Sequence, residues 1–134
     1  MLLLLPAAVL VFLVLGGLAV DFTAAWSAER ELAGAAAAAA NDAASRAVDL
    51  DHLYATGELR LQPDEARLVA ERSVVGAGLH RLAATVAEVE VTGLTVRVSV
   101  RGRARHLFAG AVPGGPEGVD VEASATVTAE EPAR

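Results

Sequence analysis

The sequence predicts an α+β fold in which one long N-terminal helix is followed by a small antiparallel sheet and one further helix. Three observations predict this fold. Residues 2–20 carry no charged side chain, residues 22–50 are rich in alanine, and much of the C-terminal half alternates apolar and polar side chains with a period of two. The first two patterns are typical of helix, and the third is typical of strands with one buried face. A chain of 134 residues has room for one domain beside such a helix.

The first element is the apolar segment LLLLPAAVLVFLVLGGLAV, residues 2–20. As a helix it would extend roughly 28 Å, which is close to the thickness of the bilayer core. We therefore expect residues 1–21 to form an uncleaved, single-pass transmembrane anchor that contacts membrane lipid through residues 2–20. A cleaved signal peptide is the alternative, but this segment is long for the apolar region of one.

We expect the helix to continue without a break to about Leu50, so that residues 22–50 form its second half outside the membrane. Alanine is the best helix former, and it lets another backbone come close while burying little apolar surface itself. The segment is therefore either a spacer helix or a surface packed against the chain's own sheet or a neighbouring subunit. The residues expected on one stripe are Phe22, Trp26, Leu32, Ala36, Ala40, Ala43 and Ala47.

Residues 51–134 are expected to form a small α+β domain. Gly57 marks a turn, and Leu59 and Leu61 flank Arg60 in what is read as a short strand. A helix is predicted over residues 63–78, because proline at the first helical position and acidic residues in the first turn favour helix initiation. Its expected apolar face consists of Ala66, Val69, Ala70, Val74 and Ala77.

Three segments, residues 85–92, 95–105 and 119–129, show the alternation of strands with one buried face. Their expected inward side chains are Ala87, Val89, Val91, Val96, Val98, Val100, Ala104, Val119, Val121, Ala123, Ala125 and Val127. Arginines alternate along the middle segment and acidic residues along the outer two, so opposite charges can pair across neighbouring strands. The 63–78 helix and the outer half of the long helix are the candidates to cover the apolar face.

Composition and spacing disfavour several classes of function. A net charge of −6 argues against nucleic acid as a partner. The absence of cysteine excludes a disulfide framework, a thiolate zinc site and a cysteine nucleophile. The three histidines, His52, His80 and His106, are scattered without metal-ligand spacing. We therefore predict that the protein is not an enzyme and uses no cofactor.

Two features remain as candidates for interaction. Asp21 places a carboxylate at the end of the apolar span, where it either simply ends the hydrophobic run or makes a specific contact. The segment HLFAGAVPGGPEG, residues 106–118, puts Phe108 in a long connection between strands. Apolar side chains in such a loop either cap the core or offer a contact to a partner.

The N-terminal region resembles that of TadE/TadG-like proteins, which belong to the tight-adherence (Flp-type) pilus. The resemblance rests on Ala19-Val20-Asp21 at the end of the span, Arg30 about ten residues later, and the run AANDAA at residues 39–44. It is specific over about residues 15–45. It implies a pilin-like fold and a single-pass protein of the cell membrane with an extracytoplasmic C-terminal domain.

The function that the resemblance implies is a membrane-anchored subunit or assembly factor of a Tad-type pilus or a related secretion apparatus. Its partners would be other pilin-like or pilus-assembly proteins, including further copies of itself. The alternative is a membrane-tethered extracytoplasmic binding module, unrelated to pili, that uses the arginine face of the sheet on an anionic partner. The candidate interaction residues are Asp21, Arg30, Ala36, Ala40, Ala43 and Phe108.

Overall fold

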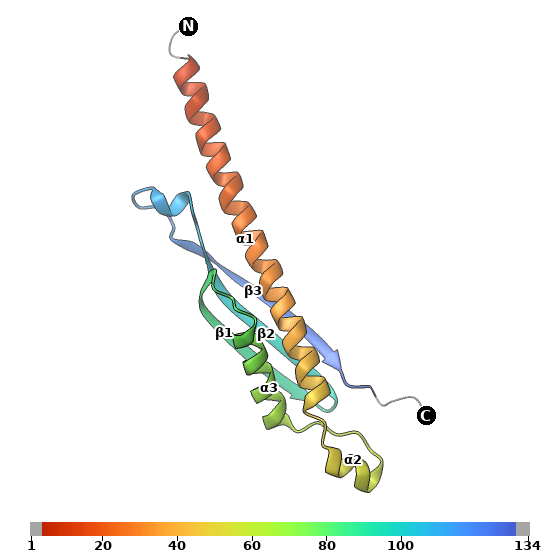
Figure 1. The fold of residues 1–134 in the computed structure, drawn as a ribbon. Coiled ribbons are helices and arrows are strands. Elements are labelled where there is room, and N and C mark those ends of the chain that lie inside the picture. The colour runs from red at the N-terminus through yellow and green to blue at the C-terminus, as the bar shows by residue number, and fades with distance from the viewer. Residues whose placement is uncertain (1–3, 131–134) are drawn as a thin grey trace.

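The computed structural model describes residues 4–130 and confirms the α+β class (Figure 1). The described part of the chain forms three α-helices, one short 3-10 helix and a three-stranded sheet. The elements in chain order are α1 (Leu4–Arg46), α2 (Leu50–Thr56), α3 (Pro63–Gly76), β1 (Leu82–Thr92), β2 (Thr95–Arg105), η1 (Ala109–Ala111) and β3 (Gly118–Thr128).

Helix α1 is continuous over 43 residues and has two different halves. Its N-terminal half projects beyond the rest of the chain, whereas its C-terminal half lies along the sheet (Figure 1). Every residue from 4 to 16 is exposed. Within residues 4–130, α1 is the one helix that is long and apolar enough to cross a membrane.

The long helix ends earlier than predicted, at Arg46 instead of Leu50. The chain then makes an isolated bridge between Val48 and Leu61, and a helix that the sequence analysis did not predict, α2, begins at Leu50. The Asp49 carboxylate accepts the His52 N–H (3.0 Å) and so caps α2, because an N-cap aspartate satisfies an otherwise unpaired amide. Two helices therefore follow α1, where one was predicted.

Helix α3 begins at Pro63, as its sequence predicts, and buries Ala66, Val69, Ala70 and Val74. The prediction was wrong for Ala77, which is exposed because it lies just past the helix end. Ser73 Oγ donates a hydrogen bond to Asp42 Oδ2 (2.9 Å), which joins α3 to α1.

The sheet has the order β1-β2-β3, and both neighbouring pairs are antiparallel. The central strand β2 contributes the largest fully buried side chains of the sheet, Val96, Val98 and Val100. Helices α1 and α3 lie over one face (Figure 1), as predicted. Val119 was expected to face inward but is 37% exposed, because β3 there extends toward the edge of the helical cover.

The alanines of α1 pack on the chain's own sheet and on α3. The side chains of Ala36, Ala39, Ala40 and Ala43 are fully buried. Small side chains let the helix lie close to the sheet, so this packing answers the choice between a spacer and a packed surface in favour of packing.

The prediction of the buried stripe of α1 was wrong for Phe22 and Trp26, just after the apolar segment. Phe22 is 80% exposed and Trp26 is 60% exposed, whereas Asp21 and Ala28 are buried. Positions 21, 28 and 35 lie on one side of a helix with 3.6 residues per turn, and they face the domain. Both aromatic side chains consequently point away from it.

Candidate functional site

The most specific contact of the described chain is built around the buried carboxylate of Asp21, which is 5% exposed. Oδ1 accepts hydrogen bonds from the backbone N–H groups of Leu107 (2.7 Å) and Phe108 (2.9 Å). Oδ2 accepts the N–H of Ala109 (2.8 Å). An ionised carboxylate is an acceptor only, so three converging N–H donors match it without leaving a polar atom unpaired.

These donors are 86 to 88 residues away from Asp21 in sequence. They belong to the connection between β2 and β3, which we call the 107–116 loop. The base of the loop is closed by His106, whose N–H donates to the Glu117 carbonyl oxygen (3.1 Å). The His106 ring also approaches the site, with Nδ1 3.8 Å from Asp21 Oδ2. Asp21 therefore holds the loop against α1 at the end of the apolar span.

A second contact fixes the same loop one turn closer to the N-terminus. The Phe108 ring lies directly on Gly17, which is buried, and a Cβ atom at position 17 would overlap the ring. Only glycine leaves room for this approach, because every other residue carries a Cβ. Gly17 and Asp21 are four residues apart and therefore lie on the same side of α1.

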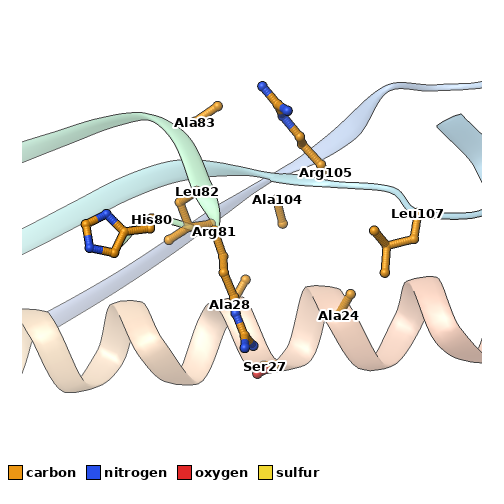
Figure 2. A pocket seen from close by; sticks show the side chains of 10 residues that line it. All are labelled: Ala24, Ser27, Ala28, His80, Arg81, Leu82, Ala83, Ala104, Arg105 and Leu107. Carbon is orange, nitrogen blue, oxygen red and sulfur yellow. The ribbon is translucent and has the colours of Figure 1, made fainter. Parts of the chain in front are cut away.

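A cavity of about 560 Å³ lies next to this contact, on the side of the domain. Its walls come from α1, the start of β1, the end of β2 and Leu107 (Figure 2). Figure 2 shows Arg81 reaching across to α1 beside Ser27, and Arg105 at the opposite rim. Alanines and leucines make up more than half of the lining, and the rest is polar or charged. The guanidinium of Arg81 also lies 3.7 Å from the carboxylate of Glu31.

Backbone irregularity shapes the β1 wall of this cavity. The pairing of β1 with β2 shifts register between Ala83 and Val86. Ala84 adopts a left-handed conformation, with φ of 52°, which is uncommon for a residue with a side chain. The bulge lies opposite Gly102, where a Cβ would stand 3.3 Å from that of Leu82. The start of β1 is thereby bent locally where it borders the cavity.

Among the six candidate interaction residues, the structure brings together Asp21 and Phe108. Arg30 is exposed, and its guanidinium carbon lies 5.9 Å from the centre of the Trp26 ring. The other three candidates, Ala36, Ala40 and Ala43, lie in the core formed with the chain's own sheet and α3. Sequence reasoning missed the role of Gly17, whose only signal was its position four residues before the aspartate.

The arginine face of the sheet is partly neutralised within the chain. Arg101 pairs with Glu122 (3.1 Å) and Arg103 pairs with Asp120 (3.0 Å) across β2 and β3, so the predicted pairing of opposite charges between neighbouring strands is confirmed. These pairs weaken the case for a free cationic surface that binds an anionic partner.

The described residues 4–130 were also compared with the pattern of a metal site. In that part of the chain, no three histidine, aspartate or glutamate side chains gather where they could hold a metal ion. Comparison of the chain with protein-family models, curated proteins and solved structures found no match. The geometry of the Asp21 contact and of α1 therefore carries the functional argument.

Proposed function

We propose that the protein is a membrane-anchored, pilin-like subunit or assembly factor of a Tad-type pilus or related secretion apparatus. One observation carries the proposal: a single helix is bare and apolar in its first half and packed on an antiparallel sheet in its second half. This is the arrangement expected of pilin-like proteins. The resemblance of residues 15–45 to TadE/TadG-like proteins supports the same proposal.

The exposure of the apolar half supports membrane anchoring. Large side chains along it, such as Leu5 (75% exposed), Leu10 (64%) and Phe12 (76%), contact nothing in the described chain that could shield them. Removing apolar surface from water is worth about 25 cal/mol per Å², so a helix this bare strongly favours lipid over water. A core helix of a soluble protein would instead be buried by its own chain.

The boundary between the two halves also suits a membrane interface. The apolar span ends at Asp21, and Phe22 and Trp26 are exposed directly after it. Tryptophan is enriched at the interface between lipid and water, which accommodates both the ring and the polar N–H of Trp26. We infer that the domain from residue 28 onward stands outside the cytoplasmic membrane, and that its neighbours there are pilus or secretion proteins.

Membrane anchoring is tested by fractionation of cells that produce the full-length protein. We expect the protein to stay in the pellet after carbonate washing. We also expect external protease to degrade the C-terminal domain in spheroplasts, and mass spectrometry to find the apolar segment still attached. Release by carbonate, or a mature chain that lacks the segment, would remove the anchor from the proposal.

Assembly is tested by cross-linking in the same cells. The chain has no cysteine, so single cysteines can be placed at will. Ala33→Cys lies on the exposed side of α1, and Ala36→Cys, on the buried side, is its matched control. We expect adducts with pilus-apparatus proteins or with a second copy from position 33 alone. Unchanged surface assembly after deletion of the gene, with no adduct at position 33, would contradict the pilin-like role.

A further inference from the structure

The 107–116 loop carries exposed apolar side chains at the level of the membrane boundary. Its sequence is LFAGAVPGGP, ten residues without a charge, between His106 and Glu117. Leu107 is 66% exposed and Val112 is 49% exposed. Exposed apolar side chains grouped on one short loop indicate a surface that is covered in the working protein.

The position of the loop along α1 is fixed by two independent contacts. The Asp21 carboxylate holds the backbone of residues 107–109 at the end of the apolar span. The Phe108 ring lies on Gly17, which is four residues, or about 6 Å, further into that span. The loop therefore reaches the depth of the last turn of the apolar segment.

Aromatic side chains at the same level point to the same surroundings. Phe22 and Trp26 are exposed on α1 within about one and a half turns of Asp21, on sides of the helix that the loop does not cover. Figure 1 shows the loop extending sideways from α1, at the end of the sheet nearest the projecting half of the helix. A bilayer that surrounds residues 4–20 would therefore meet the loop as well.

We propose that the 107–116 loop is a second membrane contact, which inserts its apolar side chains into the interfacial layer of the bilayer beside α1. This inference rests on the proposed membrane anchor. The occupant is lipid because the loop is continuous with the apolar span through Phe108 and Gly17, and because it carries no charge that a protein partner or a headgroup would pair. The interfacial layer still contains water, so the exposed backbone groups of the loop remain hydrated there.

The test uses full-length protein in vesicles of phosphatidylcholine and phosphatidylglycerol, with a single cysteine carrying an environment-sensitive fluorophore. Val112→Cys reports on the loop. Leu13→Cys reports on the span, and Thr126→Cys, on the exposed face of β3, reports on the aqueous domain. Each label is quenched in turn by iodide in the buffer and by lipids that carry spin labels near the headgroup.

We expect the fluorescence maximum of the label at position 112 to lie at a shorter wavelength than that of the label at position 126. We also expect lipid spin labels to quench it several-fold more strongly, and iodide several-fold less strongly, than the label at 126. Iodide quenching at 112 equal to that at 126, with position 13 still protected, would overturn the loop contact and leave the anchor intact. Protection at 112 from both quenchers would also overturn it, because a second protein surface would then cover the loop.

Position 13 separates the two proposals. If iodide quenches the label at 13, the anchor itself fails and the loop contact fails with it.

A further variant, Asp21→Asn, tests whether the carboxylate positions the loop. In that background we expect weaker lipid quenching at 112 and unchanged quenching at 13. Unaltered quenching at 112 would refute the positioning role of Asp21.

Discussion

The packing of α1 on the sheet makes a quantitative prediction for Ala36 and Ala40. Both side chains are fully buried between α1, the sheet and α3. Leucine is nearly as good a helix former as alanine, so Ala36→Leu and Ala40→Leu add bulk and leave helix propensity almost unchanged. Any loss of stability then reports on the contact between helix and sheet.

The expected loss follows from the absence of space at these positions. Each substitution forces three extra carbon atoms into a contact with no exposed surface, and overpacking of a core costs about 1–3 kcal/mol. For a domain of this size, 1 kcal/mol lowers the melting temperature by about 4–8 °C. Ala33→Leu and Ala37→Leu lie on the exposed side of the same helix and are matched controls, expected within about 0.5 kcal/mol of the parent.

The assay is thermal unfolding of the full-length protein in detergent micelles, monitored by circular dichroism. Amide hydrogen exchange of β2 gives a second readout that the detergent-bound half of α1 does not affect. We expect Ala36→Leu and Ala40→Leu to melt several degrees lower and to exchange faster along β2. If Ala36→Leu and Ala40→Leu have the same melting temperatures as the two controls, α1 does not pack on the sheet as described. The interpretation of the alanines as a packing surface is then refuted.

Three further predictions concern other parts of the chain. Leu13→Arg should cost about 2.5–3.5 kcal/mol of membrane insertion and reduce the carbonate-resistant fraction, whereas Leu13→Ile should not. Asp21→Asn places an amide where the carboxylate accepts three N–H groups. Amide hydrogen exchange should therefore become faster for residues 107–109 and stay slow for β2. Gly57→Val should destabilise by about 1–2 kcal/mol in denaturant titration because φ is 77°, whereas Gly76→Ala, inside α3 with open space around it, should not destabilise.

Period-two alternation was sufficient to predict the strands, because each has one face in the core and one in water. The sequence also indicated that opposite charges could pair across neighbouring strands, and the structure gives the register in which Arg101 and Arg103 meet Glu122 and Asp120. The end of α1 was missed because an alanine-rich sequence contains no strong stop signal. The bridge between Val48 and Leu61 that follows it joins two separate segments of the chain, which a local pattern does not detect.

The contact of Asp21 with the 107–116 loop could not be predicted from the sequence. Asp21 was selected for its place at the end of the apolar span, but hydrophobic patterning assigned the buried stripe to Phe22 instead. A buried aspartate needs hydrogen-bond donors, and here the donors come from residues 107–109, in the connection between β2 and β3. A local pattern has no means of detecting a partner that far along the chain.

The unbroken course of α1 has a geometric consequence for how the domain is presented to its neighbours. No break in the helix separates the projecting half from the half that lies on the sheet, so the two halves keep a fixed orientation to each other. Each residue of an α-helix advances the chain by about 1.5 Å and turns it by about 100°. Inserting one alanine after Ser27 would thus turn residues 4–27 by more than a quarter turn relative to the sheet, and would move Asp21 away from the backbone of residues 107–109. For the proposed membrane-anchored protein, the number of residues between the apolar half and the sheet therefore determines which surface of the domain faces a neighbour in the same membrane.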